Sequence, residues 1–136
     1  MVQIDVTYEG SLRCRAVHGP SGQSLLTDAP VDNHGKGETF SPTDLVATAT
    51  ASCMLTIVGI VAAREGIDVA GAGASVVKHM SVDGPRRIGR LQIVLRLPSA
   101  LTPDERRHLE AAARGCPVAR SLHPDTAVEL AFEYAA

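Results

Sequence analysis

The longest uncharged stretch of this sequence runs from Leu45 to Ala63 and constrains the fold more than any other feature. It lies within a predicted helix over residues 42–65, which has Pro42 at its first position and Gly66 just past its end. Apolar side chains surround this helix on all sides, so it needs partners around its full circumference. One short chain has few elements to supply them, and the pattern therefore predicts oligomerisation as a dimer.

The same stretch is long enough to be considered as a membrane span, which takes about 20 apolar residues. Several threonine and serine side chains interrupt it, alanine is abundant, and aromatic anchors do not flank it. The sequence on both sides is rich in strand-like patterns. We therefore predict a helix buried within a globule, with no membrane association.

Size and charge narrow the range of functions. At 136 residues, the chain is predicted to form a single domain over residues 1–136. Its 13 basic and 15 acidic residues are mixed along the sequence, which leaves no basic patch for nucleic acid. The N-terminal residues show no secretory signal, so we expect a cytoplasmic protein. Three widely spaced cysteines argue against a disulfide framework and indicate reactive or buried thiols.

The other segments alternate between strand-like and helix-like patterns. A loop is predicted over 29–40, and a second helix begins at Thr102 and Pro103 and stops near Gly115. The order of strands and helices is βββ-α-ββ-α-β, which is typical of an α+β fold with segregated helices. The strands are predicted over residues 2–8, 12–18, 23–28, 71–82, 86–97 and 128–133.

Cys53 lies in the middle of the long predicted helix, among small or apolar neighbours such as Ala49 and Ile57. Burial there disfavours the thiolate, and the helix dipole acts only over the first turn. Cys53 is therefore expected to react at neutral pH only beside a positive charge from another segment. The alternative is an unreactive cysteine that packs as a small hydrophobic side chain.

Cys116 begins the segment Cys-Pro-Val-Ala-Arg-Ser-Leu, which predicts a short helical turn with Cys116 as its N-cap and Pro117 at its first position. Peptide dipoles favour an anion there, so local sequence alone indicates Cys116 as the more easily ionised thiol. The alternative is a loop cysteine before a proline that ends the preceding helix. Cys14 shares a predicted strand face with Leu12 and Ala16, and we expect it to serve in packing.

Patterns for other kinds of site are missing from the sequence. The five histidines fall at no ligand-like spacing and no paired-cysteine motif occurs, so no metal or other cofactor is predicted. The sequence also contains no serine nucleophile elbow and no phosphate-binding glycine loop. A buried thiol together with a thiol at a helix start suggests dithiol redox chemistry.

The two cysteine motifs and their separation resemble those of a known superfamily. Phe-Ser-Pro-Thr-Asp-Leu at 40–45 is followed by Ala47, Ala49, Ser52 and Cys53, and then by the Cys116 motif. This combination resembles the OsmC/Ohr superfamily of osmotically inducible and organic hydroperoxide resistance proteins, over almost the whole chain. The resemblance implies an OsmC-like fold, in which two sheets surround a long central helix in an intertwined homodimer.

The resemblance also implies a function, that of a thiol-dependent peroxidase. Cys53 would attack the O–O bond of an organic hydroperoxide and become a sulfenic acid, with an alcohol as the product. Cys116 would resolve it as a Cys53–Cys116 disulfide, which a lipoylated or thioredoxin-like dithiol protein reduces. No bound cofactor is required. An aliphatic pocket around Cys53 would favour apolar organic hydroperoxides over hydrogen peroxide.

Peroxidase members of the superfamily also place an arginine of the first hairpin beside the thiolate. Arg13 is the first candidate for this role and Arg15 the second. Hydroperoxide resistance members carry a glutamate after the helix-opening proline to orient the arginine, whereas this chain has Thr43 there. Glu38 or Asp44 could replace that glutamate, although Asp44 has the structural alternative of capping the helix.

Two other functions stay open at the level of the sequence. The chain could be a non-catalytic OsmC-like dimer that binds a small apolar ligand or handles another thiol-reactive compound, because the family glutamate is absent. It could also be a structural or interaction protein whose buried thiols are inert.

Overall fold

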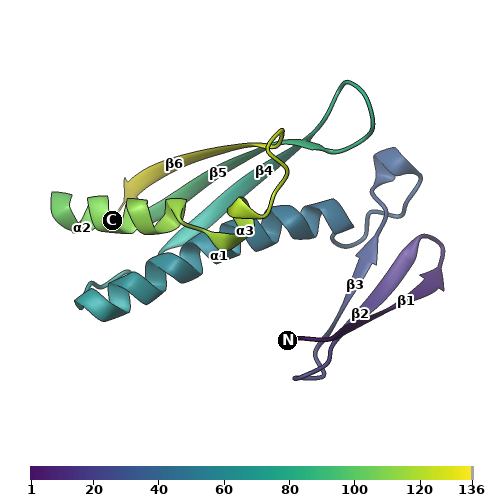
Figure 1. Cartoon of the computed structure of the whole chain (residues 1–136), viewed down its shortest axis with the longest axis horizontal. Coiled ribbons are helices and arrows are strands. Elements are labelled where there is room, and N and C mark those ends of the chain that lie inside the picture. The colour runs from purple at the N-terminus through teal and green to yellow at the C-terminus, as the bar shows by residue number, and fades with distance from the viewer. Residues whose placement is uncertain (136) are drawn as a thin grey trace. The chain divides into compact units, whose positions relative to one another are not determined.

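The computed structural model describes residues 1–135 and contains two three-stranded sheets and a long helix. The chain divides into two compact units, residues 1–46 and the part from Ala47 onward. Helix α1 (Pro42–Glu65) begins in the first unit and continues in the second (Figure 1). The α+β architecture and the order of strands and long helices are those that the sequence predicts.

The first unit contains an antiparallel sheet of β1 (Ile4–Gly10), β2 (Arg13–His18) and β3 (Ser24–Asp28). The first hairpin turns at Ser11 and Leu12, whose φ angles are 54° and 62°. Two such residues make a turn that matches the twist of the flanking strands. The predicted strands over 2–8 and 12–18 leave the turn at residues 9–11. In the structure β1 instead continues to Gly10, with a register irregularity between Tyr8 and Gly10, and the turn lies later. Leu12 lies in the turn and not in the strand that carries Cys14.

One face of the first sheet is apolar and exposed. Ile4, Val6 and Tyr8 alternate along β1 and are 57%, 63% and 63% exposed. Val6 pairs with Ala16 and Tyr8 with Cys14 across the antiparallel ladder, so these partners share the face. The single chain thus leaves apolar surface uncovered here.

The loop after β3 folds back on itself and contains the short 3-10 helix η1 (Val31–Asn33). The backbone N–H of Asp28 donates to the carbonyl of Phe40 at 3.0 Å, which joins the two ends of the loop. Gly35 approaches Ala29 so closely that a Cβ atom there would lie 1.7 Å from the Ala29 carbonyl oxygen. Only glycine fits this position, and the tight closure returns residue 38 to the end of β3.

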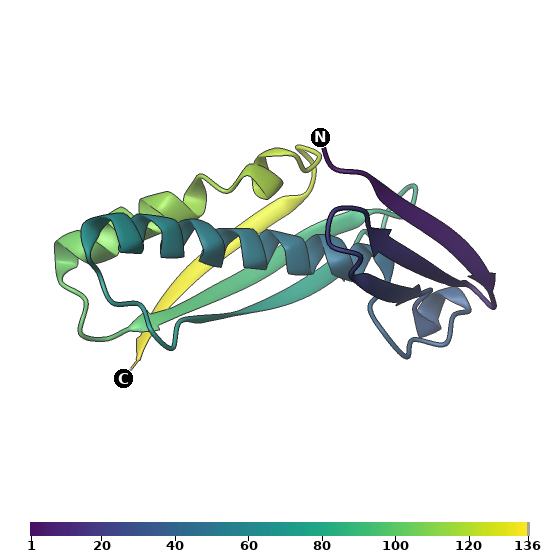
Figure 2. The same cartoon turned by 90° about the horizontal axis from the view of Figure 1, so that it is seen from below.

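The second unit contains the other sheet, in the order β4-β5-β6. Strands β4 (Gly73–Met80) and β5 (Ile88–Pro98) are antiparallel, and β6 (Ala127–Ala135) is parallel to β5. A parallel neighbour requires a crossover, and α2 (Pro103–Arg114) and the short α3 (Pro117–Arg120) provide it. These helices and α1 lie on the same face of the sheet (Figure 2).

The core of the second unit joins α1 and α2 to the inward face of β5. One stripe of α1 is buried there, and Leu109 and Ala113 of α2 are fully buried. The opposite stripe of α1, which includes Ser52, Thr56 and Ile60, is exposed. Helix α1 is also the one helix within residues 1–135 that is long and apolar enough to cross a membrane. The buried strand positions are Leu91, Ile93, Leu95 and Leu97.

Candidate active site

The start of helix α1 is fixed by a capping box between Ser41 and Asp44. The backbone N–H of Asp44 donates to Ser41 Oγ at 3.0 Å, and the Ser41 N–H donates to Asp44 Oδ2 at 2.9 Å. Reciprocal bonds of this kind satisfy two amide groups that the helix itself cannot pair. The structural alternative for Asp44 is thus observed. Thr43, at the position of the family glutamate, has its hydroxyl 3.2 Å from Ser41 Oγ.

Cys53 lies on α1 at a half-buried position, where it packs against the core of the second unit. The sequence predicts a buried Cys53, and in the single chain it is buried only in part. In the single chain the neighbouring stripe of α1, which carries Ser52 and Thr56, is exposed. The Cys53 side chain is therefore partly accessible.

Cys116 is the fully buried thiol, with 0% of the residue exposed. As predicted, it is the N-cap of α3, and its sulfur accepts from the Ala119 N–H at 3.4 Å. The sulfur also lies 3.8 Å from the Thr50 carbonyl oxygen, to which the thiol donates. Burial raises the pKa of Cys116, and interaction with the Cys53 side chain raises it further. The prediction of an easily ionised Cys116 is wrong, because desolvation outweighs one capping amide.

The structure thus brings together the two cysteines that the sequence selects. The Cys53 side chain on α1 helps to raise the pKa of Cys116 at the start of α3, so the two side chains are near enough to interact. All three cysteines are free thiols. Cys14 lies on β2 in the first unit, paired with Tyr8 and Thr27. The interaction of Cys53 with Cys116 is compatible with dithiol chemistry between them.

Arg13 is held by two carboxylates within the first unit. Its Nε donates to Asp28 Oδ1 at 2.6 Å, and its Nη2 donates to Asp28 Oδ2 at 2.8 Å and to Glu38 Oε2 at 3.1 Å. Arg15 instead pairs with Glu9 at 3.0 Å, between side chains that are both substantially exposed. A two-pronged pair fixes a guanidinium more firmly than one exposed contact. Arg13 is therefore the better oriented of the two candidate arginines.

Asp28 is a partner of Arg13 that the sequence analysis missed. It is 1% exposed, and its carboxylate also accepts from the Glu38 N–H at 3.1 Å. Hydrogen bonds from Arg13 lower the pKa of Asp28, against the effect of burial. Strands β2 and β3 pair with Asp28 opposite Arg13. A correct prediction of that register would have identified Asp28. Alternation within β3 alone does not show that pairing.

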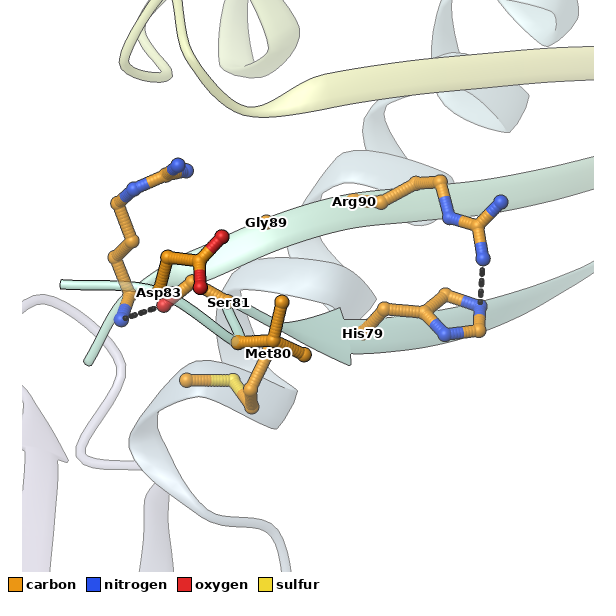
Figure 3. Close-up of a pocket in the computed structure, with 8 residues that line it drawn as sticks. His79, Met80, Ser81, Asp83, Gly89 and Arg90 are labelled. Atoms are coloured by element: carbon orange, nitrogen blue, oxygen red, sulfur yellow. Dashed lines mark hydrogen bonds between the residues drawn. The ribbon is translucent and has the colours of Figure 1, made fainter.

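A separate hollow of about 370 Å³ lies where the β4–β5 hairpin turns. His79 and Arg90 point toward one another across it (Figure 3), with Arg90 Nη2 3.4 Å from His79 Nε2. His79 Nε2 also lies 2.7 Å from Gln92 Oε1. No cysteine lines this hollow, so it is distinct from the thiol pair. Its lining residues are His79, Met80, Ser81, Val82, Asp83, Arg87, Gly89 and Arg90.

Residues 35–131 match the family model described as OsmC-like protein. The chain belongs to the OsmC-like family. The matched range contains all of α1, strands β4 and β5, the first part of β6 and both members of the thiol pair. The resemblance to the OsmC/Ohr superfamily is thereby confirmed. Among curated proteins, no sequence matches this OsmC-like chain.

Solved structures of several OsmC-like proteins share this fold. An osmotic stress induced and detoxification response protein from Psychrobacter arcticus 273-4 is 47% identical, with a TM-score of 0.91 over 98% of this chain and 96% of that chain. The OsmC organic hydroperoxide resistance protein of Legionella pneumophila is 18% identical, with a TM-score of 0.74 over 98% and 96%. The organic hydroperoxide resistance protein OhrB of Bacillus subtilis is 18% identical, with a TM-score of 0.72 over 98% and 98%.

The chain thus belongs to the OsmC-like family and shares its fold with two organic hydroperoxide resistance proteins. The similarity to the Psychrobacter protein extends over nearly all of both chains and therefore includes α1. It indicates that α1 belongs to the shared OsmC-like fold.

Proposed function

We propose that the chain is a thiol-dependent peroxidase that reduces organic hydroperoxides to alcohols. The observation that carries this proposal is the interacting pair of free thiols, Cys53 on α1 and Cys116 at the start of α3. A peroxidase of this type needs one accessible thiol to attack and a second within reach to resolve. Membership of the OsmC-like family supports the same chemistry.

The proposed reaction balances in two steps at the thiol pair. The Cys53 thiolate attacks one oxygen of the hydroperoxide, an S–O bond forms, the O–O bond breaks, and the departing alkoxide takes a proton to become the alcohol. Cys53 is then a sulfenic acid. The Cys116 sulfur attacks it, an S–S bond forms, and the hydroxyl leaves as water with the Cys116 proton. An external dithiol, a lipoylated or thioredoxin-like protein, restores both thiols.

Arg13 is proposed as the positive charge that stabilises the Cys53 thiolate. Two observations within the first unit support Arg13 over Arg15, namely the two-pronged bond to Asp28 and the further bond to Glu38. Glu38 is proposed to take the orienting role of the family glutamate, whose position is Thr43 here. The carboxylate of Asp44 is engaged at the helix cap, so we assign it to the positioning of α1.

The immediate surroundings of Cys53 support a preference for apolar substrates. Its neighbours along α1 include Ala49, Thr56 and Ile57, and the residue packs against the apolar core. Such surroundings bind the alkyl group of an organic hydroperoxide and give hydrogen peroxide no comparable contact. We propose a cytoplasmic location, where dithiol proteins are kept reduced.

We further propose that one OsmC-like domain functions as a homodimer. The family match from residue 35 to 131 crosses the boundary between the two compact units, which supports a single domain. The exposed apolar face of β1, with Val6 and Tyr8, and the exposed stripe of α1 both need cover. A second copy of the chain would bury such surface, because large apolar patches are uncommon on monomers.

Steady-state consumption of cumene hydroperoxide, with dihydrolipoamide as the dithiol donor, tests the proposed activity. The wild-type chain is expected to consume it faster than hydrogen peroxide, and Cys53→Ser to lose at least about 100-fold in rate. Cys14→Ser is the matched control and should keep the wild-type rate, because Cys14 lies outside the thiol pair. A Cys53→Ser variant that retained the rate would contradict the proposal.

Cys116→Ser separates the attacking thiol from the resolving thiol. With one equivalent of hydroperoxide, this variant is expected to accumulate the Cys53 sulfenic acid, which dimedone traps and mass spectrometry detects. The wild-type chain should instead form the Cys53–Cys116 disulfide. Dimedone labelling at Cys116 in the wild-type chain would reverse the assignment of the two roles.

A further inference from the structure

Cys53 and Cys116 present two sulfur atoms at one level of α1, within the core of the second unit. The Cys116 sulfur lies 3.8 Å from the Thr50 carbonyl oxygen. In an α-helix that oxygen accepts from the N–H four residues later, so it lies at the level of Cys53 and Met54. Cys53 packs against the core cluster to which Cys116 belongs. The two thiols, remote in sequence, therefore come together at this level of the helix.

The two thiols differ in access, and the Cys116 sulfur is held in place. Cys53 is half-buried, whereas Cys116 is 0% exposed. The Ala119 N–H donates to the Cys116 sulfur at 3.4 Å. Because the sulfur is the acceptor in this bond, the bond persists when the thiol loses its proton, and it then stabilises the thiolate. A small ligand can thus enter at Cys53 and reach a second sulfur whose position is fixed.

The number of ligands at this place decides which ions fit. Within residues 1–135, no three or more histidine, cysteine, aspartate or glutamate side chains gather so as to hold a metal ion. Zinc sites in proteins use roughly three or four such ligands, and calcium and magnesium take about six or more oxygen atoms. Thiolates instead select soft cations such as Cu(I), which is stable between two sulfur atoms. The cysteine pair has the number and kind of ligands that such an ion requires.

The surroundings of the pair also favour a soft ion. The core cluster around the two cysteines consists of apolar side chains from α1, α2, α3 and the second sheet. Such a shell limits the access of water, which would compete with the sulfur ligands for the ion. The two ligands come from α1 and from the start of α3, so no paired-cysteine motif marks the site in the sequence.

We propose that Cys53 and Cys116 together bind one soft cation that accepts two sulfur ligands, with Cu(I) as the ion to be tested. Both thiols lose their protons, two S–Cu bonds form, and the two protons pass to solvent. No atom changes its oxidation state. The site needs only the reduced chain and no hydroperoxide, so the inference goes beyond the proposed function and does not rest on it.

Anaerobic competition with bathocuproine disulfonate, whose Cu(I) complex is coloured, measures the affinity and the stoichiometry. The wild-type chain is expected to take up one Cu(I) per chain. Cys53→Ser and Cys116→Ser should each weaken binding at least about 100-fold, because each removes one of the two ligands. Cys14→Ser is the matched control and should bind as the wild-type chain does. If Cys116→Ser does not fold, Cys116→Ala keeps an apolar group at the buried position and takes its place.

Two further readouts report on the coordination itself. X-ray absorption of the Cu(I)-loaded chain should show two sulfur neighbours, and loading at pH 7 in weak buffer should release about two protons per ion. Zn(II), tested in the same way against a zinc chelator, should bind at least about 100-fold more weakly than Cu(I), since it lacks further ligands here.

Three outcomes would overturn the inference. Wild-type affinity in a folded Cys116→Ser or Cys116→Ala variant would show that Cys53 alone holds the ion. An equal loss in Cys14→Ser would show binding by any thiol of the chain. Uptake of half an equivalent would place the ion between two chains, each supplying a single cysteine.

Failure of the proposed function is distinguishable from failure of this inference. A chain that binds one Cu(I) at both cysteines and consumes no hydroperoxide would keep the metal site and contradict the function. A chain that consumes hydroperoxide and leaves Cu(I) with the competitor would keep the function and remove the metal site.

Discussion

The sulfur of Cys116 lies 3.8 Å from the carbonyl oxygen of Thr50, to which its thiol donates within the core of the second unit. Thr50 is one turn of α1 before Cys53, so this contact holds the Cys116 side chain beside the segment that carries the other thiol. The bond exists only while Cys116 is protonated. Cys116 is therefore expected to enter the proposed reaction as a thiol, after Cys53 has been oxidised.

The two thiols are expected to differ in their rates of alkylation. At pH 7 iodoacetamide should modify half-buried Cys53 at least about 10-fold faster than Cys116, which is fully buried and has a raised pKa. Modification of Cys116 should rise only as the pH passes above the ordinary thiol pKa, about 8.5. Peptide mass spectrometry after timed quenching measures both rates. Equal rates at pH 7 would show that Cys116 is not protected as the structure indicates.

Asp28 is expected to make folding stability depend on acid pH. Because its pKa is lowered in the folded chain, it contributes stability at pH values above the ordinary carboxyl pKa, about 3.9, and this contribution is lost as the pH falls further. Asp28→Asn should therefore lower Tm at pH 7 and lose part of the acid-dependent decline. Thermal melts between pH 2 and pH 7 measure Tm, and Glu9→Gln, which removes the exposed partner of Arg15, is the control. Parallel curves of Tm against pH for the wild-type chain, Asp28→Asn and Glu9→Gln would contradict the prediction.

Asp44 is expected to matter for helix stability more than for catalysis. Asp44→Ala should lower the free energy of unfolding by about 1 kcal/mol, because it breaks the capping box with Ser41. Thr102→Ala, which breaks the capping box of α2, is the matched control and should cost a similar amount. Both variants should keep the peroxidase rate within about 3-fold. A much larger rate loss in Asp44→Ala at similar stability would assign Asp44 to the catalytic machinery.

Two glycines in unlike settings are expected to respond in opposite ways to alanine. Gly35→Ala would place Cβ 1.7 Å from the Ala29 carbonyl oxygen, so the loop must open and the free energy of unfolding should fall by more than about 1 kcal/mol. Gly59→Ala meets no atom within 4 Å in the single chain and lies inside α1, where alanine is favoured by about 1 kcal/mol. Urea denaturation compares the two; a destabilised Gly59→Ala would indicate close packing of α1 against another chain.

The proposed homodimer is expected to depend on the apolar face of β1. Val6→Asp places a charge on that face, where Val6 is 63% exposed in the single chain, and should shift the chain toward a monomer. Val82→Asp is the control, because Val82 is 96% exposed at the β4–β5 hairpin. Sedimentation velocity across a concentration series measures the association. A Val6→Asp variant that sediments as the wild-type chain does would exclude this face from the interface.

Helix starts and caps were predicted well, because they are set by residues that are adjacent in the sequence. The helix start at Pro42, the cap at Thr102 and the N-cap position of Cys116 were all readable from a few adjacent residues. The turn of the first hairpin was predicted too early in the chain. Its two left-handed residues are Ser11 and Leu12, whereas such turns usually contain asparagine, aspartate or glycine.

The ionisation of the thiols could not be predicted in the same way. A capping amide at Cys116 is visible in the sequence, whereas the burial of its sulfur depends on packing against α1, which is remote in the chain. Desolvation is the larger of the two effects on the Cys116 pKa. The sequence thus indicated which cysteines to consider, and local sequence alone did not predict the raised pKa of Cys116.

The sequence by itself determined the order of strands and helices, the long uncharged helix and the pair of cysteine motifs, because these depend on periodicity, capping residues and short segments. Tertiary structure alone decided that Arg13 meets Asp28 and that Cys116 lies buried against Thr50. Both contacts join residues that are far apart in the chain, through strand register in one case and helix packing in the other. Neither leaves a local pattern, since side chains that meet only in the folded chain place no constraint on their neighbours in sequence.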